Sequence, residues 1–257
     1  MRDGAAHLAA MIPAENRWTV TLRNAVCEMR GGVQNSDVLV EQLRAVRTAV
    51  AAVAPTDLVV SVGGDCAVEL APVEAALSAH QNRLAVVRFD AHADLNSPET
   101  SPSGAFHGMV LRTLMGDGPD ELKPSRILPA DLVVLAGVRA LDPGEQDFID
   151  RRGIRHLSVT QLGDPELLLS AVRATGAEAV YIHIDLDVLD PGVFSSVGSP
   201  EPDGLTVGTL LRAVRALAEE FTPAGIGITE YERADETDKD EEPLEHVVAG
   251  VLDAVRK

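Results

Sequence analysis

The fold prediction starts from nine consecutive residues, Val86-Val87-Arg88-Phe89-Asp90-Ala91-His92-Ala93-Asp94. They begin as a short, mostly apolar run of strand type and then place polar residues at alternate positions. Because side chains two positions apart in an extended chain project to the same side, Asp90, His92 and Asp94 can converge on one point beyond the strand. Two carboxylates and an imidazole suit a divalent cation, although a strand that runs into a polar turn explains this pattern better when it is taken alone.

A second cluster of the same kind lies in His183-Ile184-Asp185-Leu186-Asp187-Val188-Leu189-Asp190-Pro191, at the end of another predicted strand. Asp185 and Asp187 share one side of the chain, and His183 and Asp190 flank them. These carboxylates could simply cap the turn before the proline. Unpaired carboxylates at a buried strand end are costly, however, and the few basic residues nearby do not obviously balance them.

The two clusters together provide the ligands of a dinuclear metal site. They supply four carboxylates and an imidazole. Such a set of ligands can bind two bridged cations, and these in turn hold one hydroxide nucleophile. This interpretation assumes that the two clusters are adjacent in space. If they are, two divalent cations supply the positive charge that the strand ends need.

Strands and helices alternate along the chain, which predicts an α/β fold with a mostly parallel sheet covered by helices on both faces. Ligands of such folds bind beyond the carboxyl ends of the strands, where both clusters fall. We predict one domain over residues 1–257, in which residues 1–35 are the least readable part. Strands are expected over residues 18–22, 58–62, 84–89, 132–136, 155–157, 179–184 and 225–229, and helices over 5–11, 37–53, 68–79, from 108, and over 145–152, 165–175, 207–220 and 244–255. The acidic run over residues 235–242 is expected to be a solvated loop.

The composition limits the function classes. The formal net charge of −18 argues against nucleic-acid binding and against an anionic membrane surface, because both need basic surface. Cationic substrates or metals are compatible with it, and so is a solvated acidic exterior. Two cysteines, Cys27 and Cys66, form no disulfide framework at this length. With no apolar run of membrane-spanning length and no leader pattern, we expect a soluble, cytoplasmic protein.

With these residues in hand, the chain resembles the arginase (ureohydrolase) family over roughly residues 58–229. Three segments are similar to the family motifs: Gly63-Gly64-Asp65-Cys66-Ala67, the run Asp90 to Asp94, and the run His183 to Pro191. The loop from Asn96 to Gly108 resembles the substrate loop of arginases in particular. Residues 139–145 and 204–206 are also similar to arginase segments.

The resemblance implies a three-layer α/β/α fold and a centre of two manganese ions. It further implies hydrolysis of a guanidinium C–N bond by a hydroxide that the metals hold. The physical chemistry agrees, because the guanidinium carbon is a poor electrophile and needs a hydroxide available near neutral pH. By this resemblance Asp90 and Asp185 bridge the metals, and the other ligands are His92, Asp187, Asp94 and Cys66.

The resemblance also assigns two residues to the reaction itself. His107 would carry the proton to the leaving amine, for which an imidazole has a suitable pKa. Glu230 would hold the guanidinium as a bidentate partner. A solvated loop histidine and an ordinary exposed acid are the alternative interpretations of these two positions.

Five further residues match positions that recognise an amino-acid substrate: Asn96, Ser103, Asp142, Glu145 and Thr206. The first four would contact the α-amino and α-carboxylate groups. Asp142 could instead cap the helix that starts near the following proline. The loop before His107 together with Asp142 favours an amino-acid substrate over agmatine.

Three positions depart from the family pattern. Cys66 stands where the family has its first metal-ligand histidine, and a thiolate there would favour zinc, iron or cobalt over manganese. If Cys66 is only a small buried hydrophobe, one metal would be weakly held or absent. Ala105 and Ala140 replace polar residues of the amino-acid site, so a modified arginine or another guanidino acid fits as well as arginine.

We therefore expect a metal-dependent hydrolase of arginine or a closely related guanidino acid. The alternatives are an agmatinase-, N-hydroxyarginine- or formimidoylglutamate-hydrolysing enzyme, and a degenerate member that only binds a guanidino ligand. A homo-oligomer, a trimer or hexamer, is expected by analogy with the family alone.

Overall fold

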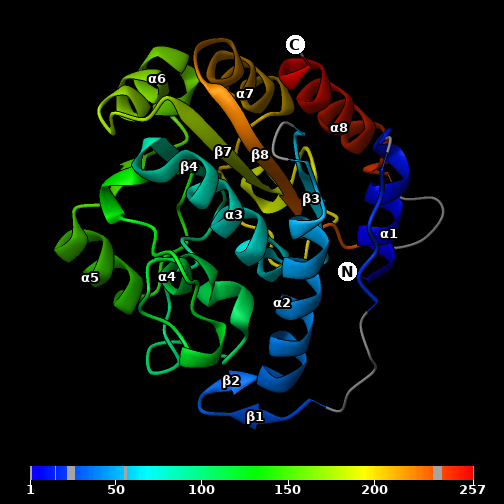
Figure 1. Ribbon diagram of the computed structural model, residues 1–257. Helices are drawn as coiled ribbons and strands as arrows, with labels where there is room; N and C mark the ends of the chain where they lie inside the picture. Colours follow the sequence, from blue (N-terminus) through cyan, green and yellow to red (C-terminus); the bar gives the residue numbers. More distant parts are fainter. Residues whose placement is uncertain (1, 15, 22–26, 55–56, 234–238, 257) are drawn as a thin grey trace.

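A computed structural model of the protein describes residues 2–14, 16–21, 27–54, 57–233 and 239–256. Its centre is a sheet of six strands in the order β3-β8-β7-β4-β5-β6, and every pair of neighbours is parallel. The predicted parallel sheet is therefore confirmed (Figure 1). The strands are β3 (Val60–Val62), β4 (Leu84–Phe89), β5 (Val133–Ala136), β6 (Arg155–Leu157), β7 (Ala179–Asp185) and β8 (Thr222–Thr229).

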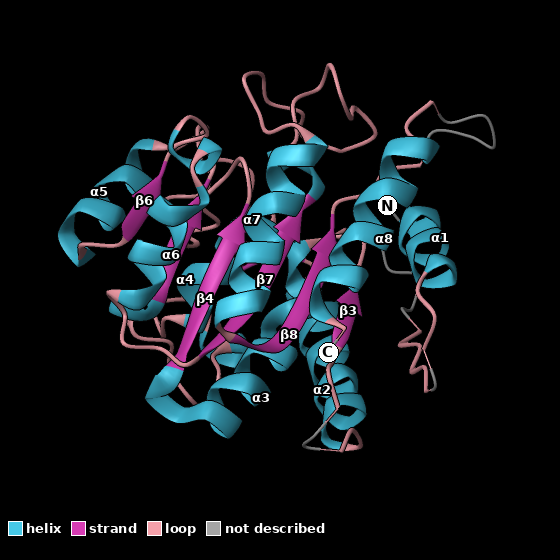
Figure 2. Cartoon of the chain, turned by 90° about the horizontal axis from the view of Figure 1, so that it is seen from above, coloured by secondary structure: helices cyan, strands magenta, loops and turns pink. Residues whose placement is uncertain are grey.

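Helices cover both faces of this sheet, which confirms the three-layer α/β/α architecture (Figure 2). A hydrophobic core lies on each face of the sheet, because side chains along a strand point to the two faces alternately. Val87 and Phe89 of β4 face one helical layer, and Val86 faces the other. The layer on the Phe89 side contains α1 (Arg2–Met11), α6 (Pro165–Arg173), α7 (Val207–Glu220) and α8 (Glu241–Val255). The opposite layer contains α2 (Ser36–Ala51), α3 (Leu70–His80), α4 (Val110–Leu114) and α5 (Pro143–Arg152).

The segment before the sheet differs from its prediction. Residues 18–21 form no strand, and the last residue of the predicted strand, Leu22, lies outside the described residues. Trp18 is 48% exposed, so the alternating apolar residues there do not mark a buried strand face. A short antiparallel hairpin of β1 (Met29–Arg30) and β2 (Val33–Gln34) follows, separate from the main sheet.

Two predicted helix boundaries are also corrected. The helix expected from residue 108 is a 3₁₀ turn over Phe106–Met109 followed by the short α4. Helix α8 starts at Glu241, within the segment that was predicted to be an acidic loop. Negative charge is favourable at a helix N-terminus, so Glu241 and Glu242 suit the first turn. Residues 235–238 of that predicted loop lie outside the described residues.

The strand order explains where a ligand can bind. From β4 the chain builds β5 and β6 on one side, and it then returns to build β7 and β8 on the other. The carboxyl ends of β4 and β7 therefore flank the point where the direction of winding changes, which is the usual ligand crevice of such sheets. Phe89 pairs with Ile184 in this register, so the residues that follow, Asp90 and Asp185, leave the sheet side by side.

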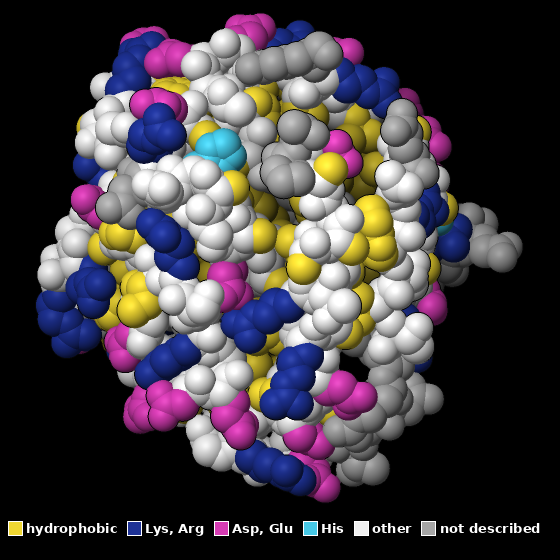
Figure 3. Space-filling model, viewed as in Figure 1, with side chains coloured by type: hydrophobic (Ala, Val, Ile, Leu, Met, Phe, Trp, Pro, Cys, Tyr) yellow, Lys and Arg dark blue, Asp and Glu magenta, His cyan; other side chains and the backbone are white. Residues whose placement is uncertain are grey.

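One face of the surface mixes charges of both signs. On the face shown in Figure 3, Lys and Arg side chains lie next to Asp and Glu side chains. Within the described part of the chain, none of the helices has the length and apolar character needed to cross a membrane.

Two adjacent leucines of α6 test the core. Leu168 is fully buried under the sheet, whereas Leu167 is 43% exposed. We expect Leu168→Ala to lower the free energy of unfolding by about 2–5 kcal/mol, because it leaves a cavity in a packed core. Leu167→Ala is the matched control and should stay within about 0.5 kcal/mol of the parent. Chemical denaturation of both variants measures the difference, and equal losses would contradict the assigned face of α6.

Candidate metal and substrate site

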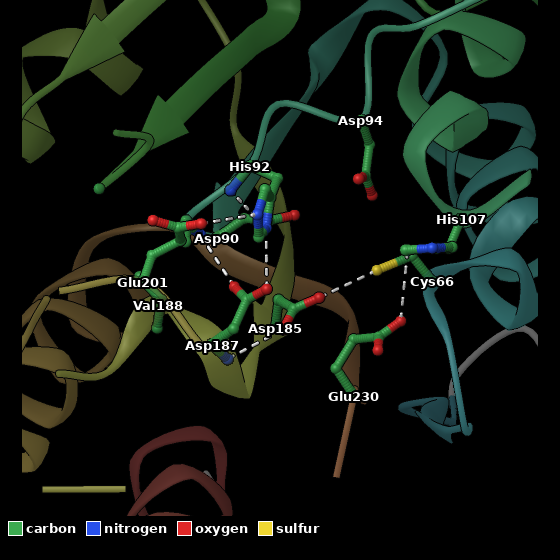
Figure 4. A network of polar contacts seen from close by, with 12 residues as sticks. Cys66, Asp90, His92, Asp94, His107, Asp185, Asp187, Val188, Glu201 and Glu230 are labelled. Carbon is green, nitrogen blue, oxygen red and sulfur yellow. Dashed lines mark hydrogen bonds and ion pairs between the residues drawn. The ribbon is translucent and has the colours of Figure 1, made fainter. Parts of the chain in front are cut away.

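Two groups of potential metal ligands lie at the carboxyl ends of the central strands, and they share Asp90. Within each group the ligand atoms lie within 4.8 Å of one another. We call the first the cysteine group and the second the histidine group. The cysteine group consists of Cys66, Asp90, His183 and Asp185, and the histidine group of Asp90, His92 and Asp187. Figure 4 shows the labelled members of both groups converging from several segments, and the two predicted clusters are therefore adjacent in space.

Local hydrogen bonds hold the histidine group. Oδ1 of Asp90 accepts from the backbone N–H of His92 at 2.7 Å, which fixes the turn after β4. Nδ1 of His92 lies 2.9 Å from Oδ2 of Asp187 (Figure 4). The backbone N–H of Ala91 donates to the other oxygen of Asp187 at 3.0 Å. The side chain of His92 is 30% exposed, so this group is open to solvent on one side.

The cysteine group is fully buried. Cys66 begins a 3₁₀ turn that Asp65 caps by accepting from the N–H of Ala67 at 2.9 Å. Its Sγ lies 3.2 Å from Oδ2 of Asp185, to which the thiol donates. Burial and the nearby carboxylates raise the pKa of the Cys66 thiol. Asp185 in turn accepts from the backbone N–H of Asp187 at 2.9 Å, so it also caps the turn that follows β7.

Arg88 is the main residue of the site that the sequence analysis missed. Its side chain is 1% exposed, and Nη2 donates to Oδ2 of Asp90 at 2.8 Å and to Oδ2 of Asp94 at 2.5 Å. A basic residue therefore compensates two carboxylates of the first cluster, a role that was not predicted for Arg88. The alternation that groups Asp90 with His92 also places Arg88, two residues earlier, on the side of Asp90, and this signal was overlooked.

Asp94 is held by Arg88 and belongs to neither ligand group. It adopts φ 53°, a left-handed backbone conformation that costs a residue other than glycine on the order of 1–3 kcal/mol. Burial, and then the charge of Asp90, raise the pKa of Asp94 to about 6, although the guanidinium of Arg88 opposes this. Its role as a metal ligand stays a prediction.

His183 forms a buried chain of polar contacts with Glu69, which the sequence analysis also missed. Nδ1 of His183 forms a short contact with Oε2 of Glu69, and Nε2 lies 3.4 Å from Oδ2 of Asp90. The hydroxyl of Tyr181 donates to the other oxygen of Glu69 at 3.3 Å. Glu69 lies against Gly227 of β8, where an added Cβ would stand 0.9 Å from Oε1. No pattern in the sequence marks the contact between Glu69 and His183, because it joins a 3₁₀ turn to β7, the fourth strand after it.

Glu230 and His107 face one another beside the ligand groups (Figure 4). Glu230 directly follows β8 at φ 65°, and its side chain is almost fully buried. Oε1 has no hydrogen-bond partner and lies 3.8 Å from Nδ1 of His107. Burial, followed by the charges of Asp65 and Asp94, raises the pKa of Glu230 to about 9. An unpaired carboxylate in such a place is suited to a cationic ligand.

Three of the predicted substrate residues contact one another. Nδ2 of Asn96 donates to Oδ2 of Asp142 at 2.8 Å, and the N–H of Asp142 donates to Oε2 of Glu145 at 3.0 Å. Asp142 is also the N-cap residue of α5, the alternative that the sequence left open. Glu145 accepts from the N–H of Leu95 at 2.8 Å, so it ties α5 to the loop after β4. Burial raises the pKa of Glu145 to about 7.

The other two predicted substrate residues are exposed and make local bonds. Oγ of Ser103 accepts from the N–H of Ala105 at 3.1 Å. Thr206 is the N-cap of α7, and its hydroxyl accepts from the N–H of Thr209 at 3.2 Å. The structure does not place either residue in a ligand group.

Arg139 holds two loops of the site together. Its guanidinium donates to the backbone carbonyl oxygens of Asp187 at 2.9 Å, Glu201 at 2.8 Å and Pro202 at 2.8 Å. Oε1 of Glu201 lies 3.9 Å from Nε2 of His92, on the open side of the histidine group. Arg139 therefore positions backbone around the site and does not itself face the ligand groups.

The fold and the site define a class: a three-layer α/β protein with a metal-type cluster of carboxylates, imidazoles and a thiol at the point where its sheet changes direction. Within that class, the chain belongs to the arginase family, whose model matches residues 3–248.

Individual relatives agree with this assignment. The chain is 34% identical over 186 residues to an arginase of Staphylococcus aureus (strain MRSA252), which covers 69% of this chain and 61% of that protein. The chain thus spans about three fifths of the length of this relative. The arginase structure from Bacillus caldovelox is 28% identical, with a TM-score of 0.79 over 91% of this chain and 81% of that one. The Entamoeba histolytica arginase in complex with L-ornithine has the same fold, with a TM-score of 0.83, 24% identity, and coverage of 93% and 84%.

The two ligand groups differ in how well they fit a metal ion. The histidine group offers carboxylate oxygens and an imidazole with access to solvent, which suits a divalent ion such as Mn²⁺ or Zn²⁺. In the cysteine group, the Asp90 oxygen also binds the guanidinium of Arg88, and both ring nitrogens of His183 face carboxylates. The residues present therefore fit one ion in the histidine group and do not fit a second ion in the cysteine group.

Arg139→Lys tests the positioning role. We expect this variant to lower the free energy of unfolding by about 2 kcal/mol, because an ammonium cannot replace several carbonyl-directed N–H groups. Hydrogen exchange of residues 186–205 should become faster. Arg215→Lys is the control, since Arg215 pairs at the surface with Asp253, and it should change neither quantity. Unchanged exchange in Arg139→Lys would show that Arg139 does not hold these loops.

Proposed function

We propose that this protein is a metal-dependent hydrolase that cleaves the guanidinium or amidine C–N bond of arginine or a closely related guanidino acid and releases urea or an analogue. Membership in the arginase family supports the reaction class. The observation that carries the proposal is the buried Glu230 carboxylate, whose Oε1 accepts no hydrogen bond from the described residues and faces His107 next to the histidine group. A cation site and a metal-type site thus meet in one crevice.

A divalent ion would be held by Asp90, His92 and Asp187. When bound there, such an ion supplies Lewis acidity and makes hydroxide available near neutral pH. Manganese is the metal that the family resemblance favours. Zinc, iron and cobalt were expected through Cys66, which lies in the cysteine group; for an ion in the histidine group they stay alternatives because its imidazole and carboxylates also suit them.

Glu230 would bind and orient the substrate. A planar guanidinium presents paired N–H groups that match the two oxygens of a carboxylate. Among the described residues, no group donates a hydrogen bond to Oε1 of Glu230, so a substrate guanidinium does not have to displace one of them. Because β8 ends at the preceding residue, the carboxylate is fixed on a rigid element.

His107 would transfer the proton to the leaving amine. Its side chain is 40% exposed, so the imidazole can exchange protons with solvent. Nδ1 of His107 lies 3.8 Å from Oε1 of Glu230. A substrate nitrogen that is bound by this carboxylate would therefore also lie within reach of the imidazole ring. An exposed imidazole next to the guanidinium site is suited to a general acid.

The far end of the substrate would be recognised by Asn96, Asp142 and Glu145, which form one polar chain. Ser103 and Thr206 are further candidates by family resemblance. Ala105 and Ala140 offer no polar side chain to the amino-acid end, which keeps N-hydroxyarginine and other guanidino acids beside arginine as candidate substrates. Agmatine and formimidoylglutamate are the competing substrates.

Assembly, location and domain organisation are also proposals. A homo-oligomer, trimeric or hexameric, is proposed by analogy with the family, and a single domain over residues 1–257 from the alternation of strands and helices. A cytoplasmic location is proposed from the cysteine usage and the sequence pattern.

A protein that binds a guanidino ligand without hydrolysing it is the second candidate. The observation that favours it is the guanidinium of Arg88, which lies between two carboxylates that were predicted to bind metal. Retention of His107 and Glu230 together argues for the hydrolase.

A substrate screen tests the proposed function. We expect the purified protein, loaded separately with Mn²⁺, Zn²⁺, Co²⁺ and Fe²⁺, to release urea or an analogue from arginine, N-hydroxyarginine or another guanidino acid. Turnover of agmatine should be at least about tenfold lower, because it lacks the α-carboxylate. Colorimetric detection of urea, with mass spectrometry of the products, measures both. No turnover of any substrate with any metal would favour the binding protein.

Two variants test the assigned roles. Glu230→Gln should lower kcat/KM on the order of 100-fold, because the ion pair with the guanidinium is lost. His107→Asn should lower kcat on the order of 100-fold or more and leave KM close to that of the parent. Glu219→Gln and His246→Asn change the same residue types at exposed positions of α7 and α8, and both should retain the parent rates. A fully active Glu230→Gln would exclude Glu230 from substrate binding.

A further inference from the structure

We propose that the guanidinium of Arg88 takes the place of one metal ion, so that this site binds a single divalent cation, in the histidine group, instead of a pair. The inference deepens the proposed function and rests on it, since both require that the site bind a divalent ion. Arg88 is then the fixed positive charge that completes the site.

The position of Arg88 is the first argument. Its Nη2 lies within hydrogen-bond distance of carboxylate oxygens from both Asp90 and Asp94, at 2.8 and 2.5 Å. With a side chain that is 1% exposed, Arg88 has no route by which to exchange these partners for water. A guanidinium stays charged in a protein under all ordinary conditions, so its positive charge is permanent.

Asp90 connects the two halves of the site. Its Oδ1 is turned toward the histidine group, 3.8 Å from Nδ1 of His92. Its Oδ2 is turned the other way, toward Arg88 at 2.8 Å and Nε2 of His183 at 3.4 Å. The carboxylate therefore bridges a potential metal position and an organic cation.

The remaining donors of the cysteine group are already engaged. The thiol of Cys66 donates to Asp185 at 3.2 Å. Nδ1 of His183 is in contact with Glu69, and Nε2, which points into the group, lies 3.4 Å from the Asp90 oxygen that Arg88 already binds. A dication placed there would also lie close to the guanidinium of Arg88, and like charges repel strongly in buried surroundings.

The histidine group has the opposite character. His92 is 30% exposed, and its partner Asp187 is held by the backbone N–H of Ala91 at 3.0 Å. An ion can enter from solvent and displace the proton shared between imidazole and carboxylate, without breaking the contacts of Arg88. One dication and one guanidinium together then neutralise three of the buried carboxylates.

Metal stoichiometry of the full-length protein tests the inference. The protein is stripped with a chelator, incubated with excess Mn²⁺, desalted and analysed by mass spectrometry of the elements. We expect about one Mn²⁺ per chain, with the paramagnetic resonance spectrum of an isolated ion. About two ions per chain with a spin-coupled spectrum, or none, would overturn the proposal.

A variant that lacks the Arg88 guanidinium provides a second test of the inference. Arg88→Met combined with Cys66→His should raise the stoichiometry from about one to about two Mn²⁺ per chain, because it removes the competing charge and supplies an imidazole. Arg47→Met, which breaks a pair with Glu74 away from the site, is the matched control and should stay at about one. A folded double variant that still binds one ion would show that Arg88 does not exclude the second. If the double variant does not fold, the parent stoichiometry and spectrum decide.

The outcomes separate this inference from the proposed function. One ion per chain without turnover of any guanidino substrate would support the single-ion site and contradict the hydrolase. Two ions per chain with turnover would do the reverse.

Discussion

The structure depends on how positive charge is supplied to carboxylates that are buried at the ends of β4 and β7. These strands are neighbours, and their register brings Asp90 and Asp185 out of the sheet side by side. Carboxylates in such a place are stable only when cations or hydrogen-bond donors compensate them. Arg88 provides part of that compensation from within the sheet, and backbone N–H groups of the two turns provide another part.

Much of the fold is readable from local sequence. The run over residues 84–89 is β4 to the residue, because a buried parallel strand is a short apolar run bounded by polar residues. Helix α5 begins where Asp142 and Pro143 predict a start. Residues 18–21 show the limit of such patterns, since alternation alone does not supply a neighbouring strand to pair with.

The site was predictable in part, for reasons that differ from residue to residue. Asp90, His92 and Asp187 follow from strand-end position and alternation. Arg88 follows the same alternation, because it lies two residues before Asp90 and projects to the same side of the strand. Its position inside an otherwise apolar run conceals this role. Glu69 could not be found in this way, because its contact with His183 depends on how α3 and the turn before it dock on the sheet.

The contact between Glu69 and Gly227 limits how this site can diverge. An added Cβ at Gly227 would stand 0.9 Å from the Glu69 carboxylate, so any larger residue there forces Glu69 away from His183. His183 would then lose the partner that orients its ring toward Asp90. A larger residue at Gly227 is therefore compatible with this site only if Glu69 changes as well, which couples β8 to the turn before α3.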